Sequence, residues 1–204
     1  NEADEVLASL FVLSKKQELS SGLTFNNLAV EAIWDGSSID FSYEQDQLGT
    51  GSYVRVKNDI TLFKDHTSIV FQPSELKILD KIWRFDPDNE ITVADKSFLF
   101  DNLKLFNGDQ YLSLNGSVSP NPKDVLGFVI HNVNLDFINT LSIRSYEGKA
   151  NGTFGLSNLY EVPEILGQLF IEDLQVNGFL IGEIDAATYL ENSRVNIELS
   201  NTRN

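Results

Sequence analysis

The residues that could carry out chemistry are few, and none of them stands in a catalytic spacing. His66 and His131 are the only histidines. Neither belongs to an HExxH sequence or to a pair four residues apart, so a zinc site or a Ser-His-Asp triad would need partners from distant segments. Cysteine is absent, which excludes thiolate ligands, a cysteine nucleophile and disulfides. The GxSxG, P-loop and GxGxxG sequences do not occur either. We therefore predict no enzymatic activity and no metal or other cofactor.

One acidic segment resembles a calcium-binding loop, Asp86-Pro87-Asp88-Asn89-Glu90. Ile91 occupies its sixth position, where an EF-hand loop has glycine, and Pro87 interrupts the spacing. We interpret the segment as an acidic turn that joins two strands.

Charge and composition limit the possible partners. The chain has 30 acidic and 15 basic residues and a formal net charge of −15, which argues against nucleic acid and anionic headgroups, because both need a basic surface. A hydrophobic fraction of 42% is enough to form a core. The longest strongly apolar run, residues 6–13, is too short to span a bilayer. Because the chain starts at Asn1 and has no methionine, we expect a piece of a longer protein whose anchor lies outside it.

The elements that would position any site are mostly strands, with one helix at the start. Apolar residues at Ala3, Val6, Leu7, Leu10, Phe11 and Leu13 follow a helical spacing. Acidic residues precede them and Lys15 and Lys16 follow, which suits the helix dipole. We predict a helix over residues 1–16 and an antiparallel β domain over residues 17–204.

From about Leu23 onward, apolar and polar residues alternate, which indicates a sheet with one apolar and one polar face. Four Asn-Gly pairs favour tight turns. We expect hairpins at Asn107-Gly108 and Asn177-Gly178, and a bulge or a turn at Asn115-Gly116 and Asn151-Gly152. Residues 135–141 could form one helical turn. The expected strands lie at 39–43, 52–57, 69–71, 91–93, 98–105, 112–115, 127–130, 133–135, 152–156, 170–176, 181–189 and 195–199.

On the strands with the clearest alternation, every second residue is apolar and is expected to face the interior. The opposite parity is mostly polar, as at Arg55, Ser113 and Glu198. The predicted apolar positions are Val54, Val56, Leu112, Leu114, Val118, Phe170, Leu174, Val176, Val195, Ile197 and Leu199.

An ordered series of loose motifs gives the chain a family resemblance. The series runs through Trp83-Arg84-Phe85, Phe98-Leu99-Phe100-Asp101-Asn102-Leu103-Lys104-Leu105, Gln110-Tyr111-Leu112-Ser113-Leu114-Asn115-Gly116, Gly148-Lys149-Ala150-Asn151-Gly152 and Leu180-Ile181-Gly182-Glu183-Ile184. In order and spacing, residues 17–204 resemble the TamB-type proteins of the translocation and assembly module, within the AsmA-like superfamily.

This resemblance implies an internal segment of a Gram-negative periplasmic protein anchored in the inner membrane. It implies an elongated antiparallel meander folded lengthwise into an open apolar trough, a β-taco, or a sandwich. The expected role is phospholipid transport between the two membranes, outer-membrane protein assembly, or both. The implied partners are phospholipid acyl chains, neighbouring β segments of the same long chain and an outer-membrane barrel assembly protein. In this resemblance, the predicted apolar positions from Val54 to Leu199 would contact the lipid.

Two other functions remain open from the residues alone. A β-sandwich module that binds carbohydrate or protein would present an exposed aromatic platform, for which Trp34, Tyr43, Tyr53 and Trp83 are the candidates. An enzyme is the other alternative, although no catalytic set of residues supports it.

Overall fold

The computed structural model describes residues 7–19, 24–140, 142, 144–191 and 194–202. About 74% of the chain is strand, and the described residues form a single antiparallel sheet of 15 strands. The prediction of a mostly β antiparallel fold is therefore confirmed. The chain divides into two compact units, residues 1–95 and residues 96–204.

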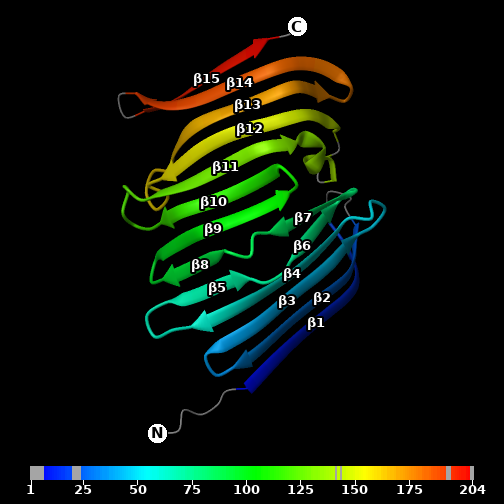
Figure 1. The fold of residues 1–204 in the computed structure, drawn as a ribbon, viewed down its shortest axis with the longest axis vertical. Helices are drawn as coiled ribbons and strands as arrows, with labels where there is room; N and C mark the ends of the chain where they lie inside the picture. Colours follow the sequence, from blue (N-terminus) through cyan, green and yellow to red (C-terminus); the bar gives the residue numbers. More distant parts are fainter. Residues whose placement is uncertain (1–6, 20–23, 141, 143, 192–193, 203–204) are drawn as a thin grey trace. The chain divides into compact units, whose positions relative to one another are not determined.

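The first unit contains eight of the described strands (Figure 1). Strands β1 to β4 pair in chain order, and β5 and β6 then share the far edge of β4, while β8 pairs with β5 and β7 with β6. The strands are β1 (Leu7–Glu18), β2 (Thr24–Asp35), β3 (Ser38–Gln47), β4 (Tyr53–Leu62), β5 (Thr67–Phe71), β6 (Glu75–Ile78), β7 (Lys81–Phe85) and β8 (Glu90–Ala94).

The second unit is a meander in which seven strands follow one another in chain order (Figure 1). The strands are β9 (Ser97–Asn107), β10 (Gln110–Val118), β11 (Val125–Asn134), β12 (Tyr146–Ser157), β13 (Glu164–Val176), β14 (Phe179–Glu191) and β15 (Arg194–Thr202). The 3₁₀ helix η1 (Leu135–Thr140) lies between β11 and β12. It confirms the predicted helical turn, although Leu141 lies outside the described residues.

The predicted N-terminal helix is wrong where the structure describes it, because residues 7–18 form β1. Residues 1–6 lie outside the described part. Strand β1 pairs with β2 over its length, from Leu7 opposite Asp35 to Glu18 opposite Thr24. It also crosses the boundary predicted between residues 16 and 17, so no separate helical segment ends there. Pairing with a distant strand has decided the conformation of a segment whose local pattern was ambiguous.

Of the four Asn-Gly pairs, two lie in hairpin turns, one lies at a bulge and one lies opposite a bulge in the neighbouring strand. Asn177 and Gly178 have φ of +52° and +76° between paired Val176 and Phe179, a type I′ hairpin turn as predicted. Asn107 pairs with Gln110, so that predicted hairpin is confirmed with Gly108 and Asp109 at its centre. At Asn115-Gly116 the register shifts, which confirms a bulge.

At Asn151-Gly152 the register irregularity lies in the partner strand. His131 and Asn132 of β11 together oppose Asn151 of β12, and Asn132 has a φ of +52°. The Asn151 side chain accepts a hydrogen bond from the Asn132 amide at 2.9 Å. Asn151 therefore stabilises the bulge next to it.

The sheet buries few side chains completely. Within the described residues, the buried apolar side chains are Trp83, Leu126, Val133 and Ala150. Trp83 is the most enclosed of them, at 1% exposure. Most other apolar residues of the strands are half-buried.

Candidate functional site

The register of the first unit gathers apolar side chains on one face of its sheet. Residues directly opposite each other in antiparallel strands share a face. Val56 lies opposite Tyr43, and Val54 lies opposite Leu76, so the two predicted valines are on the same face. This apolar face of the first unit consists of Leu10, Val12, Val30, Ala32, Trp34, Ile39, Phe41, Tyr43, Val54, Val56, Ile60, Ile69, Phe71, Leu76, Trp83, Ile91 and Val93.

The second unit has an apolar face of the same kind. Leu112 lies opposite Leu105 and Ile130, and Leu114 lies opposite Leu103 and Phe128. Val118 lies opposite Phe98 at the end of the same face. The apolar face of the second unit includes Phe98, Leu103, Leu105, Leu112, Leu114, Val118, Leu126, Phe128, Ile130, Val133, Ala150, Phe154, Leu156, Ile165, Leu169, Ile171, Leu174, Val176, Ile184, Ala186, Ile197 and Leu199.

The prediction that Phe170 lies on the apolar face is wrong, whereas Leu174 and Val176 do lie on it. Phe170 lies opposite Asn151 and Asp185, on the polar face. Asp173, with a φ of +49°, lies in a register shift between Ile171 and Leu174. The extra residue reverses the alternation, so Ile171 takes the place on the apolar face that parity assigned to Phe170.

The last strand carries the most exposed of the predicted residues. Ile197 and Leu199 lie opposite Thr188 and Ala186, and they are 77% and 67% exposed. Strand β15 pairs with β14 alone in the described structure, so one flank of each side chain has no neighbouring strand. Val195 lies opposite Leu190 in the register, but its side chain lies outside what the structure describes.

Aromatic rings pack laterally on both apolar faces. Phe71 and Phe85 stack with their centroids 4.3 Å apart in the first unit, and Phe128 and Phe154 lie 6.2 Å apart in the second. The near-parallel rings stack on each other within each sheet. Together with the other apolar side chains they form a surface without any specific hydrogen-bonding geometry.

Ion pairs and hydrogen bonds stabilise the polar face of the first unit. Arg55 donates to Asp46 at 2.6 Å and approaches Glu44 at 3.3 Å, and Asn27 donates to the other oxygen of Asp46 at 2.9 Å. The hydrogen bonds from Asn27 and Arg55 lower the pKa of Asp46 below its ordinary value of 3.8. Because the Tyr53 hydroxyl donates to Glu75 at 2.6 Å, the pKa of Tyr53 is raised. These contacts hold the strands together.

A row of rings crosses the polar face of the second unit. Phe106, Tyr111 and His131 lie opposite one another on β9, β10 and β11. Tyr111 and His131 stack with centroids 4.7 Å apart, and the Lys104 ammonium lies 4.6 Å from the Tyr111 centroid. A concavity of about 450 Å³ adjoins the row; its lining includes Tyr111, His131, Asn151, Gln168, Phe170 and Asp185.

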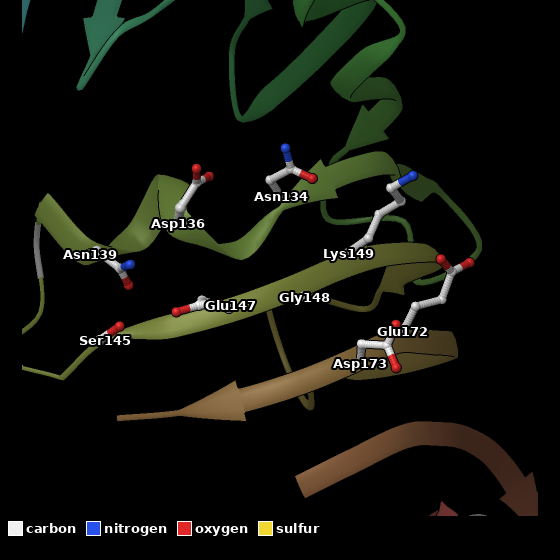
Figure 2. A pocket seen from close by; sticks show the side chains of 9 residues that line it. All are labelled: Asn134, Asp136, Asn139, Ser145, Glu147, Gly148, Lys149, Glu172 and Asp173. Carbon is white, nitrogen blue, oxygen red and sulfur yellow. The ribbon is translucent and has the colours of Figure 1, made fainter. Parts of the chain in front are cut away.

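A larger concavity, of about 640 Å³, lies beside η1 and has polar walls. Figure 2 shows Asn139 and Ser145 toward one end and Lys149 and Glu172 toward the other. Asn139 accepts from the Tyr146 amide at 2.8 Å and donates to the Tyr146 carbonyl at 3.0 Å, which fixes η1 to β12. Four carboxylates, from Asp136, Glu147, Glu172 and Asp173, line it with one lysine, so it cannot solvate an acyl chain.

The residues considered for chemistry have structural contacts. The Asn89 side chain accepts from the Phe71 amide and donates to the Phe71 and Asp86 carbonyls, so it closes the acidic turn. His66 bonds to Asp65 and stacks on Phe63. Among the residues that the structure describes, no three or more His, Cys, Asp or Glu side chains gather to hold a metal ion.

The four proposed platform aromatics do not share one face. Tyr43, Trp34 and Trp83 lie on the apolar face, and Tyr53 lies on the polar face opposite Asp46.

Sequence reasoning missed the ring row of the second unit because its members come from three strands. It also missed Ile171 on the apolar face. The available signal was Asp173 within the strand, because aspartate tolerates the positive φ of a bulge.

Comparison of the chain with protein-family models, curated proteins and solved structures finds no match. None of the helices in the described residues has the length and apolar character needed to cross a membrane. The assignment of function therefore depends on the two faces of the sheet.

Proposed function

We propose that this chain is a non-enzymatic scaffold segment that holds phospholipid acyl chains against the apolar faces of its sheet. In this proposal it belongs to a periplasmic, inner-membrane-anchored protein of the TamB type. It takes part in lipid transport between the membranes, in outer-membrane protein assembly, or in both. Neighbouring β segments of the same long chain and an outer-membrane barrel protein complete the proposed set of partners.

One observation carries the proposal: the apolar faces extend across many strands, while few of their side chains are buried. Leu112, Leu114 and Phe128 are all half-buried despite lying in the middle of the second unit. A large exposed apolar face normally marks an interaction surface. The acidic polar face would keep such a molecule in solution.

The chemistry of acyl chains suits this surface. Each buried CH₂ group contributes about 0.8 kcal/mol without requiring a hydrogen-bonding partner. A path for acyl chains therefore needs no catalytic or ligand motif, and continuous apolar residues are sufficient. Ile171, Leu169 and Ala186 extend the face of the second unit from β13 to β14.

A photo-crosslinking amino acid tests the proposal by comparing the two faces. When cells that express the chain are irradiated, probes at Leu114, Ile171 and Ile197 should capture phospholipid, and their neighbours Asn115, Phe170 and Glu198 should not. Phe170 is the sharpest control, because it is apolar but lies on the polar face. Equal capture from both faces, or capture from neither, would refute the proposal.

A second variant separates loss of lipid from loss of fold. Leu114→Asp places a carboxylate on the apolar face and should abolish capture at Ile171. Because Leu114 is only half-buried, the substitution should lower the free energy of unfolding by less than the several kcal/mol expected in a closed core. Ser113→Asp, on the polar face, is the matched control and should leave capture unchanged.

Carbohydrate binding is the second candidate function, and the ring row of the second unit favours it. Stacked Tyr111 and His131 present apolar ring surface beside the side chains of Asn151, Gln168 and Asp185. Ring faces combined with hydrogen-bonding side chains suit a sugar. A pull-down on insoluble polysaccharides tests this candidate: retention that is lost in Tyr111→Ala would support it over the acyl-chain proposal.

A further inference from the structure

On the polar face of the second unit, aromatic side chains flank Asn151 from both neighbouring strands. On one side, His131 and Asn132 of β11 together oppose Asn151 of β12. On the other side, Phe170 of β13 lies directly opposite Asn151. His131, Asn151 and Phe170 also line the same concavity of about 450 Å³. This concavity therefore has an aromatic ring on either side of a central amide.

Both rings have apolar surface left for a ligand. Tyr111, on β10, stacks on one face of the His131 ring with centroids 4.7 Å apart. The other face of that ring is left on the side of β12, where the concavity lies. Phe170 is half-buried on a face that is otherwise mostly polar, so part of its ring stays in contact with water. A ligand that covered both rings would remove this apolar area from water.

Asn151 supplies a hydrogen-bond donor between the two rings. Its side-chain oxygen accepts from the Asn132 amide at 2.9 Å, which identifies that atom, because only oxygen can accept from a backbone N–H. The side-chain nitrogen has no acceptor among the described residues, so its N–H groups are available to a ligand. Gln168 and Asp185 line the same concavity and are exposed. These groups suit a ligand with apolar ring faces and a polar rim.

The separation of the two rings favours a sugar over a planar ligand. Strands β11 and β13 are two strand spacings apart, or about 9.6 Å. A planar ring stacked between two aromatic rings needs only about 7 Å, twice the contact distance of about 3.5 Å between carbon atoms. A pyranose ring is puckered and carries axial hydrogens, so it is thicker and fills the wider gap. The net charge of −15 disfavours an acidic sugar.

We infer that this concavity binds one uncharged pyranose unit of a glycan. The sugar stacks between the rings of His131 and Phe170, and the Asn151 side chain donates a hydrogen bond to it. The inference rests on the carbohydrate candidate proposed above, and it adds the subsite and the class of sugar. It does not involve acyl chains, which the leading proposal places on the opposite face.

Saturation-transfer NMR with the 204-residue chain tests the class of sugar. The probes are cellotriose, maltotriose and chitotriose, which are uncharged, and trigalacturonate, which is anionic. At least one uncharged trisaccharide should receive saturation from the protein, and trigalacturonate should not. Binding of none of the uncharged trisaccharides, or equal binding of trigalacturonate, would overturn the inference.

Substitution of Phe170 tests the subsite with the trisaccharide that binds. Phe170→Leu keeps an apolar side chain but removes the ring, so it should raise the dissociation constant roughly tenfold. His131→Ala should have a similar effect. Leu166 is an apolar residue of the same strand and face that does not line the concavity, so Leu166→Ala is the matched control and should leave the affinity unchanged. The melting temperature of each variant checks that its fold is retained.

Retention on insoluble polysaccharide separates this inference from the candidate on which it rests. Retention that is lost in both Tyr111→Ala and Phe170→Leu would support the subsite. Retention that is lost in Tyr111→Ala but kept in Phe170→Leu would refute the subsite and leave the carbohydrate candidate in place. An unmodified chain that no polysaccharide retains and no trisaccharide binds would refute both.

Discussion

Asn58 is a polar residue in an apolar setting. It lies on β4 between Phe41 and Phe71, on the apolar face of the first unit. Its side-chain oxygen is buried, and the described residues supply no hydrogen-bond donor to it. A buried acceptor without a partner keeps the cost of its lost hydration.

Replacing Asn58 should therefore stabilise the protein. We expect Asn58→Leu to raise the free energy of unfolding by about 1 kcal/mol, because the substitution removes the unsatisfied oxygen. Urea unfolding followed by circular dichroism measures the change. Gln168→Leu, at an exposed position on β13, is the control and should change stability by less than about 0.5 kcal/mol. A lower free energy of unfolding for Asn58→Leu would show that the Asn58 side-chain oxygen has a hydrogen-bond partner.

Asp46 makes a pH-dependent contribution to the first unit. Its folded pKa is lowered by the hydrogen bonds from Asn27 and Arg55, so ionised Asp46 stabilises the fold above its ordinary pKa of 3.8. That contribution is lost as the pH falls from there through the lowered folded pKa. Because the group is partly exposed, we expect it to be less than about 1 kcal/mol at pH 7.

The comparison of Asp46→Asn with the unmodified chain measures this effect. The difference in the free energy of unfolding should be present at pH 7 and should shrink below about pH 4. Asp80→Asn, in the exposed turn between β6 and β7, removes the same charge away from Asn27 and Arg55 and is the matched control. A difference that grows as the pH falls would contradict the assigned sign.

At the scale of the element, bulges decide which residues reach which face. Gly116 lies at the shift between β9 and β10, with a φ of +112°, and a Cβ there would lie 2.2 Å from the Val125 carbonyl oxygen. Both the backbone conformation and the approach of β11 therefore require glycine. Gly178, with a φ of +76°, has no atom within 4 Å of a Cβ position.

We expect Gly116→Ala to lower the free energy of unfolding by more than Gly178→Ala does. Gly178→Ala should lower the free energy of unfolding by about 1 kcal/mol, the cost of positive φ alone. Gly116→Ala should lower it by more than about 2 kcal/mol, because strand separation is added to the strain. Thermal unfolding of both variants measures the difference. Equal effects would mean that β11 can move away from β10 at little cost.

At the scale of the whole molecule, we predict that the fold does not depend on a bound cation. The acidic turn is closed by the Asn89 amide, and no metal-binding cluster lies in the described part of the chain. We expect EDTA to leave the melting temperature unchanged at constant ionic strength. A decrease of several degrees that calcium reverses would reveal a site built from carboxylates distant in sequence.

The local sequence pattern was sufficient to predict most of the strands beyond residue 23, the polarity of the two faces and the type I′ turn at Asn177. These features are local, since alternation sets side-chain direction and Asn-Gly sets turn geometry. Val54, Leu114 and Ile197 lie on apolar faces as their parity requires.

The conformation of β1 and the face on which Phe170 lies depend on strand pairing, which the local pattern does not contain. Residues 7–13 are apolar on both sides, so no period of two marks them as a strand, and pairing with β2 supplies the missing information. Simple alternation fails across Asp173, because one extra residue there puts Phe170 on the opposite face from Leu174 and Val176. Strand pairing and bulges arise from contacts between residues that are distant in sequence, which a local pattern does not encode.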